Sequence, residues 1–318
     1  MDRLVFECHR LNSGGCRVVD AGRPGMLARG IAEGGAADRA SLSRLNEMLE
    51  QDPENPGLEF TLDAGHWLIS GQGQIAIGGA DMNWRINGRP AELYTIIDLD
   101  GDYLLQGGVA ERGVRAYIAV KGEWQKLQRV WGSVSPGVPG IDTCAVGMIF
   151  EVTSAGRAPY ASDLELDQHL PKLPLKLSVL PAPEWSWLSA EEQTRLLTTI
   201  WSVAPASNQQ GLRLAPTDQK IESPNSPRPK IQKWNASGYF PGQGSGARSA
   251  QERHLISSPV LPGTVQYPPG GEPILLLRQA QTVGGYPRVL ILNTMQDLDL
   301  LGQVSLGDGL IFQTVYSL

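Results

Sequence analysis

Short runs of alternating apolar and polar residues fill much of the first half of the chain. Each run is rich in β-branched or aromatic residues and is bounded by Gly, Asn or Asp, which is typical of half-buried strands. Turn-forming dipeptides stand beside them at Ala64-Gly65, Asn87-Gly88 and Asp100-Gly101. Strands this short and closely spaced favour a barrel or a sandwich. The runs are Leu58–Asp63, His66–Ser70, Gln74–Gly79, Tyr94–Leu99 and Val114–Lys121.

Two segments have the apolar spacing of amphipathic helices. The first is Ala37–Gln51, and its apolar face is formed by Leu42, Leu45, Met48 and Leu49. The second is Trp187–Val203, which opens on Ser189 and Glu192 at the spacing of a capping box. Its apolar stripe is formed by Leu196, Leu197, Ile200 and Trp201. We therefore predict a mainly β protein with a few short helices.

The second half returns to strands after a segment rich in Leu and Pro. This segment, Gln168–Pro183, is predicted to hold a domain boundary and to lead into a strand at Leu175–Leu180. Further strand-like runs follow in Pro273–Leu318. Between them, Asp218–Arg253 is polar and rich in Pro, with too few apolar residues to offset the entropy of ordering it. We predict a mobile surface insertion at 218–253.

Length and composition agree with a globular protein of about two domains at ~150 residues each. The chain has 318 residues, 41% of them apolar and 19% charged, with a net charge of −6. An acidic balance argues against a nucleic-acid binder, which needs a basic surface to displace counterions. Residues 1–15 carry charges in place of the apolar core of a signal peptide. We expect a cytoplasmic protein with no membrane span.

Common catalytic and metal-binding motifs are missing from the sequence. Cys8, Cys16 and Cys144 are too few for a disulfide framework and have no metal-ligand spacing, so we expect reduced, buried thiols. The four histidines are scattered as well. No metal site is predicted. The tryptophans allow two interpretations, packing in the core or a patch that binds a partner. They include Trp124, Trp131, Trp185, Trp187 and Trp201.

Five longer strings carry more information than these motifs, and they occur in a fixed order. They are VVDAGRPG at Val18–Gly25, GAADR at Gly35–Arg39, PGTVQYPPG at Pro262–Gly270, QTVGGYPR at Gln281–Arg288 and DLDLLGQ at Asp297–Gln303. In this order they resemble the biotin-dependent carboxyltransferase / allophanate hydrolase subunit 2 family, which includes the C-type subunit of 5-oxoprolinase and KipA. The resemblance covers nearly the whole chain apart from 218–253.

The resemblance implies a fold and a multi-subunit function. The fold is two cyclophilin-like β-barrel domains, at residues 1–170 and 171–318. The implied function is that of the C-type component of an ATP-dependent 5-oxoprolinase, which opens a small cyclic amide to glutamate. Its implied partners are a KipI-like homologue of the B-type subunit and a LamB/YcsF-like homologue of the A-type subunit, with ATP used at the level of the complex. Two alternatives stay open: a non-catalytic regulator of the KipA type, and a carboxyltransferase acting on urea or a related amide. The chain has no biotin-attachment string.

In the first of these strings, Arg23 stands between two glycines and beside a proline. Such a rigid turn can hold a carboxylate or a phosphate on the guanidinium, with Gly25 allowing close backbone approach. Alternatively, Arg23 pairs with Asp20 and locks the loop. The candidate substrate-binding residues here are Asp20, Arg23 and Gly25. Asp38 allows two roles as well, capping the first helix or contacting substrate.

The string Gln281–Arg288 is the candidate catalytic element. Gly284 and Gly285 bare the main chain for a flat ring, Tyr286 offers a phenol as donor or proton relay, and Arg288 offers positive charge. Gln281 and Thr282 add polar contacts. The alternative is a glycine bulge at a strand crossing, with Tyr286 packed in the core.

A further segment, Ser207–Leu214, is similar to a family string and contributes the candidates Asn208 and Arg213. It departs from that string at Gln209, Gln210 and Leu212, which replace an Arg, a Met and a Tyr. Other departures lie at Ser258 and Gln279. We therefore interpret the chain as a diverged member of the family.

Overall fold

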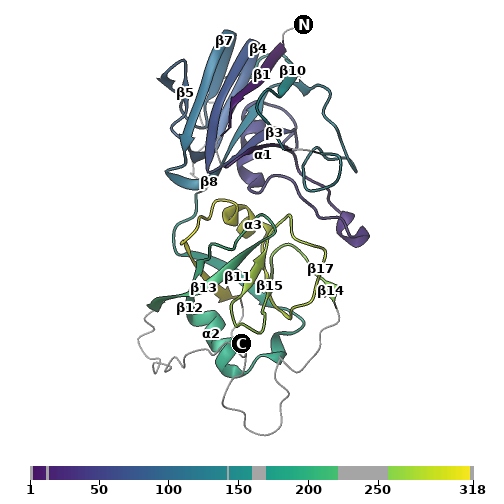
Figure 1. Ribbon diagram of the computed structural model, residues 1–318, viewed down its shortest axis with the longest axis vertical. Helices are drawn as coiled ribbons and strands as arrows, with labels where there is room; N and C mark the ends of the chain where they lie inside the picture. Colours follow the sequence, from purple (N-terminus) through teal and green to yellow (C-terminus); the bar gives the residue numbers. More distant parts are fainter. Residues whose placement is uncertain (1–2, 12–13, 142, 160–169, 221–256, 316–318) are drawn as a thin grey trace. The chain divides into compact units, whose positions relative to one another are not determined.

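The structure is a computed structural model that describes residues 3–11, 14–141, 143–159, 170–220 and 257–315 (Figure 1). The chain forms two compact units. Unit 1 comprises Met1–Pro171 and Leu298–Ser305, and unit 2 comprises Lys172–Asp297 and Leu306–Leu318. The predicted boundary at 170/171 lies beside the first of these crossings. Most of the predicted insertion, residues 221–253, lies outside the described residues, and 218–220 end a strand of unit 2.

Unit 1 is built on one sheet, which has ten strands among the described residues. Its main path runs β2-β3-β8-β4-β1-β10-β9, and β7 pairs with β4 outside this path. Figure 1 shows β7, β4 and β1 side by side. The strands are β1 (Arg3–Arg10), β2 (Cys16–Val19), β3 (Gly57–Thr61), β4 (Asp63–Asp81), β5 (Arg85–Ile86), β6 (Arg89–Pro90), β7 (Ile96–Val109), β8 (Arg112–Val120), β9 (Glu123–Trp124) and β10 (Ile149–Thr153).

Two of the predicted turns are wrong because the strands are longer than the alternation suggests. Ala64-Gly65 lies inside β4, and β3 pairs with β2 and β8 and not with β4. Asp100-Gly101 lies inside β7, where the pairing with β4 continues past it. In both cases the long ladder outweighs the local turn preference. The turn at Asn87-Gly88 is confirmed, since it joins β5 to β6 with positive φ at both residues.

The helix α1 (Arg39–Met48) confirms the first predicted helix. Its N-cap is Asp38, whose carboxylate accepts a hydrogen bond from the Ser41 N–H at 3.0 Å. The predicted apolar face is buried, and it packs on the sheet side that carries Ala76, Tyr117 and Ala119. A short 3₁₀ helix, η1 (Met26–Arg29), precedes it.

Unit 2 contains a closed barrel in the order β11-β18-β15-β16-β13-β12-β19. A separate two-stranded sheet pairs β14 (Ser258–Pro259) with β17 (Val283–Gly284). Apolar residues at alternate positions of β11 are buried. The barrel strands are β11 (Leu175–Pro181), β12 (Thr199–Val203), β13 (Gly211–Lys220), β15 (Thr264–Gln266), β16 (Ile274–Leu276), β18 (Arg288–Leu292) and β19 (Gly309–Thr314). The mainly β prediction is confirmed.

The second predicted helix is correct only in its first part. The capping box forms between Ser189 and Glu192, and α2 spans Ala190–Thr198. Residues Thr199–Val203 are strand β12 instead, and they pair with β13 and β19. These residues are mostly β-branched or aromatic, and closing the barrel with them outweighs continuing the helix. The remaining helices of the described residues are η2 (Trp185–Trp187) and α3 (Met295–Leu301).

The three cysteines are free and buried, as predicted. Burial raises the pKa of the Cys8 thiol to about 11, and it raises that of Cys16 as well. Thiols of this kind react slowly because little thiolate forms. Within the described part of the chain, no helix is long and apolar enough to cross a membrane.

Candidate functional site

The glycine-rich segment before β18 exposes main chain and a phenol in unit 2. A Cβ at Gly284 would lie too close to the side-chain amide of the buried Gln266, so a larger residue here would have to displace that amide. A Cβ at Gly285 would face open space. Tyr286 is 42% exposed, so it does not pack in the core as the alternative interpretation held. The exposed part of this segment is therefore Gly285 and Tyr286, whereas Gly284 is buried.

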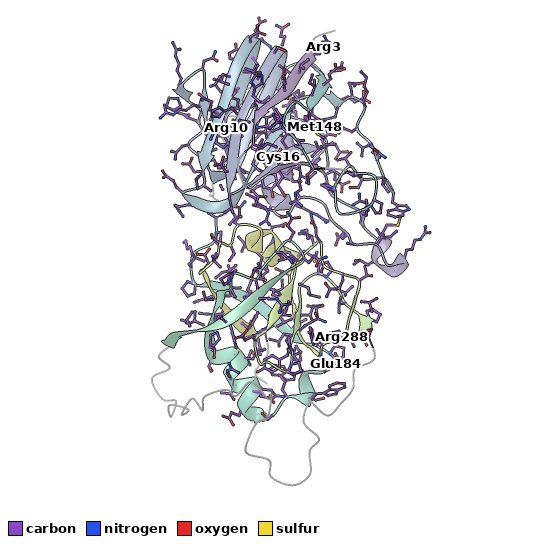
Figure 2. All side chains as sticks on the ribbon, viewed as in Figure 1. Arg3, Arg10, Cys16, Met148, Glu184 and Arg288 are labelled. Carbon is purple, nitrogen blue, oxygen red and sulfur yellow. The ribbon has the colours of Figure 1, made fainter. Side chains whose placement is uncertain are left out.

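Arg288 follows this segment and is held by Glu184 (Figure 2). Its Nε donates to Oε2 of Glu184 at 2.8 Å, and its Nη2 donates to Oε1 at 2.7 Å. The main-chain N–H of Arg288 donates to Oε2 of the same carboxylate at 2.9 Å. Nη1 donates to the carbonyl of Pro259 at 2.9 Å. The guanidinium thus joins β14, β18 and the segment before η2, and a carboxylate matches its charge.

Glu184 and Arg288 remain charged together at neutral pH. The hydrogen bonds from Arg288 hold the pKa of Glu184 below its usual value, and the same bonds raise the pKa of Arg288. The sequence alone did not single out Glu184, which lies 104 residues before its partner. Its local sequence, Pro-Ala-Pro-Glu-Trp, resembles no motif that would have marked it.

The other candidates of unit 2 fall into two places. Gln281 is exposed, and the carbonyl of Thr282 accepts a hydrogen bond from the Val260 N–H at 3.0 Å, so both adjoin the Gly284–Arg288 segment. Asn208 instead closes its own turn, with its Oδ1 accepting from the Gln210 N–H at 2.8 Å. Arg213 lies exposed on β13, and β15 and β16 stand between that strand and β18 in the barrel.

The departures from the family string differ in their surroundings. Gln209 and Gln210 are exposed in the turn that Asn208 closes, whereas Leu212 is buried in β13. Ser258 pairs with Gly284 between β14 and β17. The departures at Gln209 and Gln210 therefore lie at the surface, and the departure at Leu212 lies in the core.

In unit 1, the Asp20 carboxylate organises a buried loop that follows β9. Oδ1 accepts hydrogen bonds from the hydroxyls of Ser133 at 2.6 Å and Ser135 at 2.8 Å. Oδ2 accepts from the Val134 N–H at 2.9 Å. Oδ1 also accepts from the Gly22 N–H at 2.9 Å. The carboxylate is thus surrounded by protein donors.

Arg23 holds the same loop by donating hydrogen bonds to main-chain carbonyl groups of that loop. Its Nε donates to the carbonyl of Val130 at 3.1 Å, and its Nη2 donates to that of Ser135 at 2.5 Å. The side chain is only 1% exposed, and burial lowers the pKa of its guanidinium. Gly25 is exposed, with φ of 80°, and caps the start of η1. Asp20 and Arg23 thus lock one loop together, each through its own hydrogen bonds to that loop.

Asp38 belongs to a buried polar network at the start of α1. Its Oδ2 accepts from the Ser41 hydroxyl at 2.6 Å and from Nε2 of Gln303 at 2.7 Å. Burial raises the pKa of Asp38, and these bonds offset part of that effect. Oε1 of Gln303 accepts hydrogen bonds from the main-chain N–H groups of Val114 and Arg115, each at 3.1 Å. The strings Asp297–Gln303 and Gly35–Arg39 are therefore in contact through the hydrogen bond between Gln303 and Asp38.

A buried acid, Glu59, extends this network. It pairs with Arg17 and accepts from the Tyr117 hydroxyl and the Ala37 N–H, at 2.9 and 2.8 Å. Burial alone would raise the pKa of Glu59, but Arg17 and Arg115 outweigh it and hold the pKa low. Sequence patterns did not single out Glu59, because it reads as one polar position in an alternating strand.

The predicted site residues are thus divided between the two units. Unit 1 holds Asp20, Arg23, Gly25 and Asp38, and unit 2 holds the rest. Among the residues that the structure describes, no three His, Cys, Asp or Glu side chains are grouped to hold a metal ion.

Comparison with known proteins gives a consistent family likeness. The family model described as carboxyltransferase domain, subdomain A and B, matches residues 29–314. Over 304 residues the chain is 27% identical to the C-type subunit of 5-oxoprolinase from Escherichia coli K12, covering 93% of this chain and 86% of that protein. It is 24% identical to the C-type subunit of 5-oxoprolinase from Haemophilus influenzae, covering 94% of this chain and 87% of that protein.

A solved structure supports the fold independently. The urea carboxylase of Kluyveromyces lactis aligns with 99% of this chain at a TM-score of 0.78 and 20% identity. The chain spans only 28% of that much longer protein. At this identity the likeness shows the fold alone.

Proposed function

The chain belongs to the carboxyltransferase-domain family, subdomain A and B, and from this premise we propose that it is the C-type subunit of an ATP-dependent 5-oxoprolinase. The observation that carries the proposal is the match to the C-type subunit of 5-oxoprolinase, which extends over 93% of this chain and 86% of the relative. The product would be glutamate, formed by hydrolysis of the cyclic amide. The partners would be a KipI-like homologue of the B-type subunit and a LamB/YcsF-like homologue of the A-type subunit.

The proposed substrate contacts lie on the Gly284–Arg288 segment. A flat lactam ring would lie against the main chain at Gly285, where an added Cβ would meet no atom within 4 Å. The Tyr286 phenol would donate a hydrogen bond to the ring or relay a proton. Arg288, held by Glu184, would fix the direction of the segment and so the position of the phenol. Gln281 would add an amide contact.

We place ATP at the level of the complex and assign it to no residue of this chain. Arg23 is the candidate ligand for a carboxylate or a phosphate, and Arg288 is the candidate source of positive charge, but both guanidiniums donate to protein oxygens. A phosphate would have to displace these bonds. The chain's own contribution would therefore be to bind and orient the cyclic amide.

The test is turnover by the reconstituted complex. Glutamate formed from 5-oxoproline and ATP is measured with wild type, with Tyr286→Phe and with Tyr103→Phe as a matched control. We expect Tyr286→Phe to lower kcat about 10²–10⁴-fold, the usual range for a lost acid–base group. Tyr103, whose hydroxyl contacts Asp100 on β7, should be dispensable. A fully assembled complex that forms no glutamate from 5-oxoproline and ATP would reject the proposal.

The guanidiniums of Arg23 and Arg288 already donate hydrogen bonds to protein oxygens. This favours a second candidate function, that of a non-catalytic regulator that acts through complex formation alone. In that case Tyr286→Phe and Arg288→Ala would leave the regulated activity of the partner unchanged. The family name keeps carboxyl transfer to urea or a related amide as a third candidate. It would require a biotinyl carrier on another chain, and the absence of carboxybiotin-dependent exchange would remove it.

A further inference from the structure

Trp131 is a large aromatic side chain that unit 1 holds out to solvent. It is 49% exposed, whereas Trp67, Trp84 and Trp124 of the same unit are buried. Of the five tryptophans considered for a partner patch, Trp124 and Trp201 are buried and Trp185 and Trp187 are half-buried. Only Trp131 among these five keeps the exposure that a binding residue needs.

The backbone of Trp131 is strained. Its φ is 49°, and that of the following Gly132 is 84°. These residues form the tip of a turn that is closed by hydrogen bonds between Val130 and Ser133, at 2.9 and 3.3 Å. Two-residue turns with positive φ at both positions are normally Asn-Gly or Asp-Gly. A bulky aromatic residue is disfavoured in this conformation, and such strain concentrates at functional positions.

The buried Arg23 and Asp20, together with the exposed Arg129, hold this turn in place. Arg23 donates to the carbonyl of Val130, and the Ser133 hydroxyl donates to Asp20. Arg129 donates to the carbonyl of Gly132 at 3.1 Å, and its Nη1 lies 3.6 Å from Oδ2 of Asp20. These hydrogen bonds fix the conformation of the turn, so the Trp131 indole is held on a rigid support.

The tip itself is open. A Cβ built at Gly132 would meet no atom within 4 Å. The side chain of Arg129 is 51% exposed beside it. Trp and Arg are among the residues that most often dominate the energy of protein interfaces, by filling pockets on the partner. A small ligand would instead require a concave site that encloses most of its surface. An open tip that carries an indole and a guanidinium therefore fits a protein partner.

We propose that Trp131 is the anchor by which this protein docks onto its partner in the complex, at an apolar pocket bordered by carboxylates. The indole fills the pocket, and Arg129 meets the acidic border. The identity of the partner, a KipI-like homologue, rests on the proposed function. The strained, anchored turn does not depend on it.

The test compares Trp131→Asn with Val109→Asn, which removes a more exposed apolar side chain of the same unit. Asparagine suits the left-handed turn, so Trp131→Asn should raise the Tm by about 2–4 °C. The same variant should weaken the Kd for the purified KipI-like homologue about 30-fold or more, as measured by calorimetry. Val109→Asn should leave the Kd within about threefold. Higher stability combined with lost binding is a result that a merely structural Trp131 would not produce.

Other outcomes separate this proposal from the proposed function. If wild type binds the KipI-like homologue and Trp131→Asn binds equally well, the anchor is overturned and the proposed function stands. If wild type binds neither the KipI-like nor the LamB/YcsF-like homologue, both fall. If Trp131→Asn dissociates a homodimer, or lowers affinity for 5-oxoproline while leaving the complex intact, the turn serves a second copy or a ligand, and the proposal is overturned.

Discussion

Arg23 and Arg288 both stand next to proline and near glycine, but they bind different kinds of group. Arg23 donates to main-chain carbonyls and fixes a loop. Arg288 donates to a carboxylate and fixes a segment that carries an exposed phenol. The sequence indicated a rigid turn at Arg23 and bare main chain just before Arg288. It could not indicate their partners, because Val130, Ser135 and Glu184 are more than a hundred residues away.

The Glu184–Arg288 pair predicts a loss of stability in acid. Glu184 has a lowered pKa when folded, so its contribution is complete above its ordinary value of 4.5 and is lost as the pH falls below that value. Glu184→Gln should lower the free energy of unfolding by about 1–3 kcal/mol at pH 7. Urea unfolding at pH 7 and pH 3 should show the difference shrinking in acid. The exposed Glu272→Gln serves as control, and a difference independent of pH would contradict the assignment.

Local signals identified the beginnings of elements better than their ends. The capping box at Ser189 and the N-cap at Asp38 were readable because each acts within one helical turn. Thr199–Val203 was misread as helix because its pairing with β13 and β19 depends on distant residues. The turn expected at Asp100-Gly101 failed for the same reason, since the β4–β7 ladder decides the conformation there.

The C-terminus of α1 provides a prediction at the scale of one element. The Lys121 ammonium donates to the carbonyls of Leu49 and Glu50, which the end of the helix leaves without partners in the helix. Lys121→Met keeps the aliphatic length and removes the charge. We expect it to lower the free energy of unfolding by about 1–2 kcal/mol. Lys176→Met, at an exposed position of β11, should change the stability by less than about 0.5 kcal/mol. Equal effects of the two substitutions in urea unfolding would contradict this role.

At the scale of the whole molecule, the chain passes between the two units three times. It leaves unit 1 after Pro171, returns for Leu298–Ser305, and then re-enters unit 2 to form β19. β19 pairs with β11 and β12, so the barrel closes only after this return. The family could be read from the sequence because its strings are local. The return of Leu298–Ser305 to unit 1 could not be predicted from the sequence, because the hydrogen bond between Gln303 and Asp38 joins residues 265 positions apart.

The return predicts that Gln303 stabilises unit 1 although it lies near the end of the chain. Gln303→Ala would leave the buried N–H groups of Val114 and Arg115 without their acceptor. We expect a loss of about 2–4 kcal/mol in the free energy of unfolding, against less than about 0.5 kcal/mol for the exposed Gln313→Ala. Hydrogen exchange should show lost protection at these two amides. Unchanged protection there would contradict the role of Gln303.

The proposed role of this chain in opening 5-oxoproline is tested by leaving the chain out of the complex. The KipI-like and LamB/YcsF-like homologues are supplied with 5-oxoproline and ATP, and glutamate and ADP are quantified with and without the protein. We expect glutamate to form in step with ADP only when the protein is present. Binding to both partners with ATP consumed and no glutamate formed, or equal glutamate without the protein, would contradict it.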